Sequence, residues 1–155
     1  MSGAEQRGIR SRSKRRFLPL PAFAQLAPGF WSFPGAPGLG DEELAALCET
    51  GFSLVYADGQ RQSFLRVETE AGPALVMDSE VECRTEGDQT ACAGWVSDGE
   101  TQMTSTLVTR FDSETGALRA VTDPMDGSAP VTSYPQSCPG SAVRAALALG
   151  VTPAP

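Results

Sequence analysis

Apolar and charged residues alternate most regularly between positions 75 and 84. Odd-numbered positions are mostly apolar and even-numbered ones mostly acidic: Leu75, Met77, Ser79, Val81 and Cys83 against Val76, Asp78, Glu80, Glu82 and Arg84. A period of two, with one apolar and one charged face, is typical of a half-buried β-strand. The pattern therefore predicts a strand at the centre of the fold.

A tight turn follows this strand and fixes its pairing. Gly87 can adopt the positive φ that a two-residue turn at positions 87–88 requires. Such a turn places Cys83 opposite Cys92 in a non-hydrogen-bonded pair, where Cα atoms approach to ~4.5 Å. Because a disulfide accepts this separation, we predict a Cys83–Cys92 bond. The same register places Glu80 opposite Trp95.

Further turn signals recur at short intervals, with no helical pattern between them. They stand at Asp58 and Gly59, at 71–73, at Asp98 and Gly99, and at 112–116. This spacing is typical of an antiparallel meander of hairpins. The expected fold is therefore mainly β, a small antiparallel β-barrel or sandwich. A turn at 71–73 would also set Val67 against Met77 and Arg66 against Asp78.

Two short helices are expected, one on each side of this meander. At 41–49, Asp41 can cap the first helix, and Leu44, Leu47 and Cys48 have the spacing of a buried stripe. A second helix is expected at 141–149, with Ser141 as its cap. The stretch 123–140 contains four prolines and is expected to be irregular.

The four cysteines and the lack of histidine limit the chemistry of the chain. Zinc sites built from four cysteines usually contain closely spaced pairs of ligands, which this sequence lacks, and we expect no metal or cofactor. With Cys83 paired to Cys92, elimination predicts a Cys48–Cys138 disulfide. Two disulfides would indicate an oxidising compartment, and they would support a core in which Leu, Ile, Val and Phe make up only about 20% of the chain.

The N-terminal region resembles an export signal in its order of residue types. A basic stretch precedes an apolar run at 17–24, which ends in the small-x-small pattern of Ala22 and Ala24. We expect export to the periplasm or outside the cell, with mature protein from Gln25. Because Pro19 and Pro21 break the apolar helix, the alternative is a cytoplasmic protein with a disordered basic tail.

These features divide the chain into four parts. The export signal or basic tail occupies 1–24 and a Gly/Pro-rich lead-in occupies 25–40. We expect one β domain at 41–150 and a disordered tail at 151–155. No apolar run approaches the ~20 residues that a membrane helix needs.

Charge distribution indicates which partners the domain would bind. Residues 17–155 carry 6 basic and 18 acidic groups, a net charge of −12, which argues against nucleic acid as a partner. Asp78, Glu80 and Glu82 are expected in a row on one face of the central strand, with Trp95 beside them. This row is interpreted as a contact surface for a basic protein. The alternatives are a solvated acidic face or a weak calcium site.

The sequence predicts a binding function without catalysis. Without histidine, Ser-His-Asp and Cys-His catalytic arrangements are excluded, and no phosphate-binding loop is present. We expect an exported small β domain that binds a protein partner or a small ligand. A structural or accessory role in the cell envelope is the alternative, and an enzyme of unrecognised type is the third hypothesis.

Overall fold

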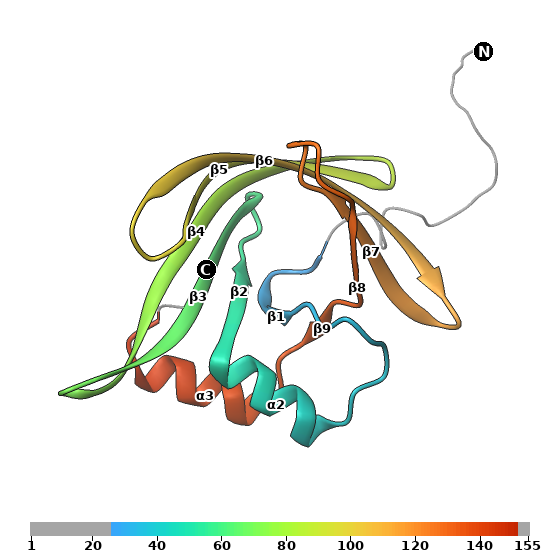
Figure 1. Ribbon diagram of the computed structural model, residues 1–155. Coiled ribbons are helices and arrows are strands. Elements are labelled where there is room, and N and C mark those ends of the chain that lie inside the picture. Colours follow the sequence, from blue (N-terminus) through green and yellow to red (C-terminus); the bar gives the residue numbers. More distant parts are fainter. Residues whose placement is uncertain (1–25, 152–155) are drawn as a thin grey trace, which may run out of the picture.

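The fold is a single antiparallel sheet that curls into a half-barrel, with two short helices at one end (Figure 1). The computed structural model describes residues 26–151. Their strands are β1 (Gly29–Ser32), β2 (Gly51–Val55), β3 (Gln60–Thr69), β4 (Gly72–Glu86), β5 (Gln89–Ser97), β6 (Gln102–Glu114), β7 (Ala117–Asp123), β8 (Val131–Ser133) and β9 (Gln136–Ser137). The helices are α2 (Asp41–Thr50) and α3 (Gly140–Ala148). The prediction of a mainly β meander with two short helices is confirmed.

The two edge strands of the sheet follow each other directly in the sequence. Its strand order is β8-β7-β6-β5-β4-β3-β2-β1-β9, so β8 and β9 form the two edges. Tyr134 and Pro135 connect them, and the backbone N–H of Tyr134 donates to the carbonyl of Pro34 at 2.8 Å. The stretch 123–140 therefore contains two short strands that the sequence did not indicate. Because Pro135 interrupts the stretch, each strand pairs with a different neighbour.

The predicted register of the β4–β5 hairpin is confirmed. Cys83 lies opposite Cys92, and their Cα atoms are 4.0 Å apart in a disulfide. Gly87 has the positive φ expected at the turn, +62°. Trp95 lies opposite Glu80, as the same register requires.

The predicted register of the β3–β4 hairpin is wrong. The turn consists of Glu70 and Ala71, because Thr69 pairs directly with Gly72. The Thr69 hydroxyl closes this tighter turn by accepting from the N–H of Ala71 and donating to the carbonyl of Gly72. Arg66 consequently lies opposite Leu75 instead of Asp78, and Val67 lies opposite Ala74 instead of Met77.

The two helices pack on each other beneath the half-barrel (Figure 1). The predicted Cys48–Cys138 disulfide joins α2 to the residue before Pro139, with Cα atoms 6.0 Å apart. Leu44 and Cys48 are buried against Ala142, whereas Leu47 is 40% exposed, so the predicted stripe is narrower than expected.

The predicted caps of both helices lie one or two residues from the observed positions. Gly40 holds the N-cap position of α2, and Asp41 is the first helical residue. Pro139 holds the N-cap position of α3, and Ser141 lies inside the helix. Neither N-cap makes a side-chain hydrogen bond. The two helices are therefore joined to the fold by packing and by the Cys48–Cys138 disulfide, without side-chain caps.

A core cluster shows which face of the sheet is concave. Leu26, Val55, Phe111 and Ala120 pack together, although β2 and β6 are not neighbours in the sheet. Such a contact is made across the inside of the curl. Side chains alternate along a strand, so Arg61, Cys83 and Thr90 share this concave side. Glu80, Glu82 and Trp95 lie on the convex side.

Candidate functional site

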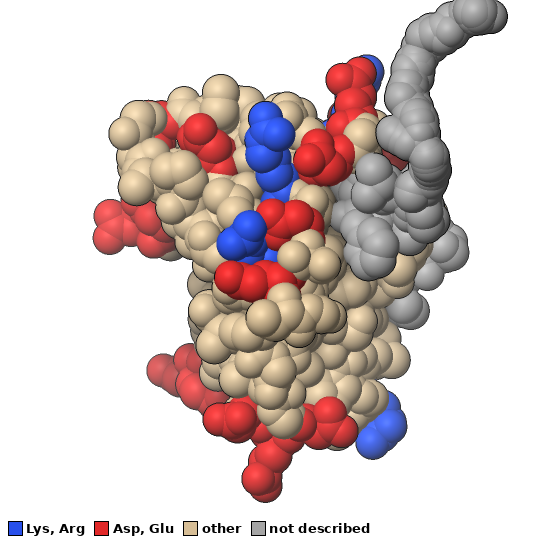
Figure 2. Space-filling view, turned by 90° about the vertical axis from the view of Figure 1, so that its right-hand side faces the viewer, with Lys and Arg blue, Asp and Glu red and all other residues tan. Residues whose placement is uncertain are grey.

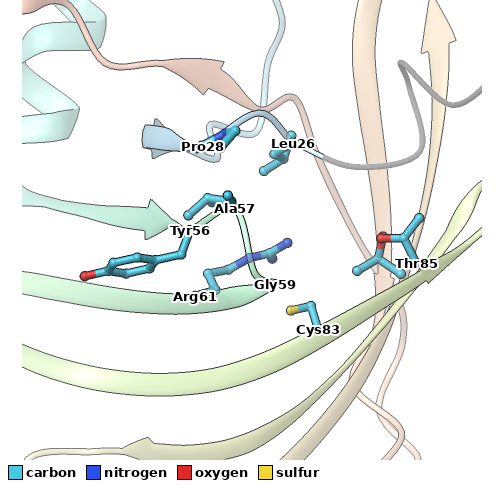
Figure 3. Close-up of a pocket in the computed structure, with 10 residues that line it drawn as sticks. Leu26, Pro28, Tyr56, Ala57, Gly59, Arg61, Cys83 and Thr85 are labelled. Atoms are coloured by element: carbon cyan, nitrogen blue, oxygen red, sulfur yellow. The ribbon is translucent and has the colours of Figure 1, made fainter. Parts of the chain in front are cut away.

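A pocket opens on the concave side, between the start of the described chain and strands β2 to β5 (Figure 3). Its volume is about 210 Å³. Leu26 and Pro28 cover one side, and the turn between β2 and β3 forms another (Figure 3). The remaining lining residues come from strand interiors or the strand ends: Val55, Tyr56, Arg61, Cys83, Thr85 and Thr90. We call this cavity the Arg61 pocket.

Arg61 carries the positive charge of the pocket. Its guanidinium points into the space between Leu26, Cys83 and Thr85 (Figure 3). The Nε atom is buried and meets no hydrogen-bond partner among the described residues. Burial lowers the pKa of Arg61 from its usual value, because desolvation disfavours the charged form. The guanidinium lies 5.9 Å from the centre of the Phe33 ring, which places it in range of a cation–π contact.

The other side chains around Arg61 do not neutralise it. Among the described residues, no carboxylate lies within 4.0 Å of its guanidinium, whereas Arg66 and Arg119 both have carboxylate partners. Hydroxyl groups line the pocket opposite Arg61, with the Thr85 and Thr90 oxygens 3.0 Å apart. The pocket thus combines one positive charge, two hydroxyls and an apolar wall.

Asp78 also lies on the concave side, which separates it from the predicted acidic row. A β-bulge falls between Ser63 and Phe64, whose partners are Ser79 and Met77, so Asp78 is the extra residue of β4. Such a residue breaks the alternation of faces. Asp78 lines a shallower hollow with Ser53 and Ser63, and its Oδ1 is buried without a hydrogen-bond partner among the described residues.

The remaining members of the acidic row lie together on the convex side. Glu80 accepts hydrogen bonds from Gln60 and Gln62, at 2.7 and 2.9 Å. Glu82 lies opposite Gln60 on one neighbouring strand, and half-buried Trp95 lies opposite Glu80 on the other. The predicted acidic row therefore consists of only Glu80 and Glu82. The side-chain amides of Gln60 and Gln62 hold Glu80 in place.

Charged residues on another side of the molecule are shown in Figure 2. Acidic side chains are spread over this face and gather at its lower end, where basic side chains are few. The first turn of α2 contributes acidic residues to that end of the molecule. No cluster of three or more potential metal ligands occurs among residues 26–151.

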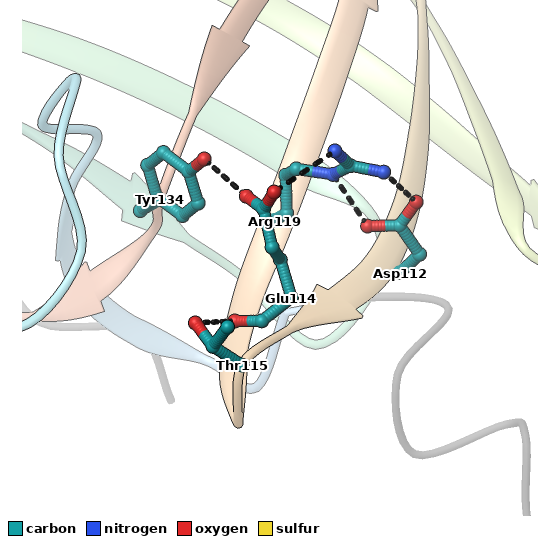
Figure 4. A network of polar contacts seen from close by, with 5 residues as sticks. All are labelled: Asp112, Glu114, Thr115, Arg119 and Tyr134. Carbon is teal, nitrogen blue, oxygen red and sulfur yellow. Dashed lines mark hydrogen bonds and ion pairs between the residues drawn. The ribbon is translucent and has the colours of Figure 1, made fainter.

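A second polar cluster ties the joint between β8 and β9 to the β6–β7 hairpin (Figure 4). Arg119 donates from Nε and Nη2 to the two oxygens of Asp112, at 2.8 and 2.7 Å. Its Nη1 lies 3.7 Å from Glu114, whose carboxylate accepts from the Tyr134 hydroxyl. These residues are exposed partners of one another, so the cluster serves the architecture and leaves the Arg61 pocket as the candidate site.

Sequence reasoning missed Arg61. Its signal was the β2–β3 turn, whose register sets Arg61 opposite Val55, an apolar core residue. A charged residue at such a position is uncommon unless it is paired. The closing wall at Leu26 and Pro28 comes from a distant part of the chain and had no sequence signal.

Comparisons with known proteins provide no family assignment. No protein-family model, curated protein or solved structure matches this chain. None of the helices in residues 26–151 is long and apolar enough to cross a membrane. Geometry is therefore the basis for the function proposed below.

Proposed function

We propose that this protein is an exported, non-catalytic domain that binds a small ligand in the Arg61 pocket. The observation that carries the proposal is a cavity on the concave side that contains an unpaired cationic side chain. Ligand sites are typically concave and mostly apolar, with a few convergent polar groups. The pocket combines the apolar Leu26, Pro28 and Val55 with Arg61 and two threonine hydroxyls.

The size of the pocket limits the ligand. Sites for drug-sized molecules usually have volumes of ~300–1,000 Å³, and this pocket has about 210 Å³. A ligand with one ring or a short chain fits this volume. The described residues that line the pocket include no nucleophile hydrogen-bonded to a general base, an arrangement that nucleophilic catalysis requires.

Export is part of the proposal. Two disulfides indicate an oxidising environment for the folded domain. The basic stretch and the apolar run of the proposed signal, 1–24, lie outside the described residues. We place the mature domain in the periplasm or outside the cell on the strength of that sequence pattern together with the disulfides.

The proposal is tested by blocking the pocket without disturbing the core. Ala57 is exposed in the β2–β3 turn and lines the pocket, so Ala57→Phe should fill it. Ala71 in the β3–β4 turn is exposed and outside the pocket, and Ala71→Phe is the matched control. Small aromatic probes, benzoate and benzamide, are titrated into the ¹⁵N-labelled full chain and followed by NMR.

Saturable shifts of the Gly59, Cys83 and Thr85 amides with either probe would support the proposal. These shifts should weaken at least tenfold in Ala57→Phe and persist in Ala71→Phe. Neither probe shifting these amides at millimolar concentration would refute it.

A second candidate function is contact with a basic protein through the convex side. Glu80 and Glu82 share that side with half-buried Trp95, and aromatic residues beside charges are common at protein interfaces. This arrangement also suits an accessory role in the cell envelope. The Arg61 pocket has the better support, because the buried Nε of Arg61 has no partner among the described residues, whereas Glu80 already accepts hydrogen bonds from Gln60 and Gln62.

A further inference from the structure

We infer that the ligand of the Arg61 pocket is a small monocarboxylate with a short apolar body. The inference rests on the proposed function and adds to it the chemical class of the ligand. Its basis is the state of Arg61, which is half-buried, aimed into the pocket and without a carboxylate partner among the described residues.

An unpaired cation in this position is unfavourable unless a ligand supplies the opposite charge. Transferring a charged group out of water is strongly unfavourable when no opposite charge or hydrogen bond compensates. The chain has many acidic residues that could have provided a partner, since residues 17–155 carry 18 of them. None of the described ones lies within ion-pair distance of Arg61. The guanidinium is thus available to an anion from solution.

The shape of the guanidinium favours a carboxylate. Its planar fork of N–H donors matches the two oxygens of a carboxylate and can bind them in a bidentate manner. The Thr85 and Thr90 hydroxyls line the same cavity. Because either hydroxyl can be the donor in the bond between them, the Thr85 hydroxyl can turn its own hydrogen toward an anion that Arg61 holds.

The charge balance favours a monoanion over phosphate or a dianion. Among the described residues that line the pocket, Arg61 is the one basic side chain. Neither α2 nor α3 brings its N-terminus to the pocket, since both helices lie at the far end of the half-barrel (Figure 1). Phosphate sites typically gather several cationic or backbone N–H donors. The net charge of −12 outside the N-terminal region would also repel a second negative charge.

The apolar wall defines the rest of the ligand. Leu26 and Val55 are buried core residues that face the cavity, and Pro28 covers it from the same side. The Cys83–Cys92 disulfide adds an apolar surface next to Arg61. A short aliphatic chain or a single ring attached to the carboxylate would lie against these groups.

Matched probes separate the class of the ligand from the existence of the site. Benzoate and benzamide have nearly the same shape and differ in charge. In the full chain at neutral pH, benzoate should bind at least tenfold more tightly than benzamide, as judged from the Gly59, Cys83 and Thr85 amide shifts. Inorganic phosphate at the same concentrations should not compete with benzoate.

Substitution of Arg61 gives a second, independent readout. Arg61→Met should abolish the preference for benzoate over benzamide, whereas Arg110→Met, an exposed arginine of β6, should leave it unchanged. Arg61→Met should also raise the urea midpoint of the ligand-free protein, because it removes a half-buried charge that has no carboxylate partner among the described residues. Arg61→Lys retains the charge without the planar fork and should weaken benzoate binding.

Each outcome distinguishes the inference from the proposed function. Equal binding of benzoate and benzamide at these amides would overturn the carboxylate inference and leave the ligand site intact. Effective competition by phosphate would also overturn it. A large loss of stability in Arg61→Met, with unchanged benzoate binding, would show that Arg61 is a structural residue packed on Phe33. Absence of binding by both probes would count against the site itself.

Discussion

The backbone N–H of Cys83 donates a hydrogen bond to the carbonyl oxygen of Gly59 at 2.8 Å. This bond fixes the β2–β3 turn against β4, next to the disulfide, and it positions one wall of the Arg61 pocket. Gly59 has a φ of +95°, which a residue with a side chain rarely adopts. A Cβ atom at this position would lie 2.5 Å from the Cys83 carbonyl oxygen.

Gly59→Ala should therefore destabilise the protein by about 1–3 kcal/mol, because the added methyl group meets backbone and the φ angle becomes strained. Urea unfolding monitored by tryptophan fluorescence measures the change. Benzoate binding should weaken as well, since the turn must shift away from β4. Gly35→Ala is the control, because a Cβ atom there has no neighbour within 4 Å. Equal stability of the two variants would contradict the role assigned to this contact.

The two disulfides should differ in how much they stabilise the fold. They close loops of very different length, with sequence separations of 90 for Cys48–Cys138 and 9 for Cys83–Cys92. In the chain-entropy treatment, these loops correspond to about 4–5 and about 2.5 kcal/mol. Replacing both cysteines of a pair with serine avoids a stray thiol.

The Cys48→Ser/Cys138→Ser variant should consequently lose about 2 kcal/mol more than the Cys83→Ser/Cys92→Ser variant. Denaturant unfolding of the two oxidised variants gives the comparison. Peptide mapping without reduction checks that the remaining bond is native. A larger loss in the Cys83/Cys92 variant would show that concave-side packing outweighs loop entropy.

The parts of the fold that the sequence predicted correctly depend on local geometry. The Cys83–Cys92 pair follows from one turn glycine and a count of residues, and Trp95 opposite Glu80 follows from the same count. The β3–β4 register failed because a threonine hydroxyl closed a tighter turn than the Gly-Pro signal indicated. A shift of this size moves every pair in the hairpin.

The candidate site was harder to predict because it depends on non-local contacts. Asp78 lies on the concave side instead of the predicted convex side because of a β-bulge, and no residue pattern in the sequence indicates this bulge. Arg61 lines a pocket only because Leu26 and Pro28, which are distant in the sequence, form the opposite wall. Alternation along a strand indicates a face, but it does not show which charged residues on that face will lack a partner.

Acid should weaken the polar cluster around Arg119, which links the β6–β7 hairpin to the segment between β8 and β9. The hydrogen bonds from Arg119 hold the pKa of Asp112 below its usual value. A carboxyl group with a depressed pKa in the folded state stabilises above its unfolded pKa of ~3.9, and this contribution is lost as pH falls through the folded pKa. Asp112→Asn should lower the urea midpoint at neutral pH, and the difference from the native protein should shrink below about pH 4.

Glu70→Gln, at the exposed β3–β4 turn, is the control for this measurement. It should give a nearly pH-independent difference from the native protein. A difference for Asp112→Asn that grows on acidification would contradict the assigned direction of the pKa shift.

Export should remove the N-terminal region. We expect the mature protein to begin at or near Gln25, after the small-x-small pattern that ends in Ala24. Fractionation of the native host, with mass analysis of the N-terminus, tests this expectation. Replacing Ala22 and Ala24 with Leu should block the cleavage. A full-length chain recovered from the cytosol would instead support the basic-tail alternative.

Binding of a basic partner to the convex acidic row can be tested with Asp78 as an internal control. Glu80 and Glu82 lie on the convex side, whereas the bulge places Asp78 on the concave side. A lysine-rich peptide serves as the probe of basic partners. The double variant Glu80→Gln/Glu82→Gln should weaken its binding several-fold and flatten the salt dependence, because screening acts over ~8–10 Å.

Asp78→Asn should leave peptide binding unchanged, since its side chain does not share that surface. The folded state should persist in both variants. A Gln at position 80 keeps an oxygen that can accept from Gln60 and Gln62, and Asn at position 78 removes a charge that has no ion-pair partner among the described residues. Equal weakening by Asp78→Asn would indicate a general effect of net charge. Unchanged binding in the double variant would identify Glu80 and Glu82 as solvated surface, and the concave pocket would then be the remaining candidate for partner recognition.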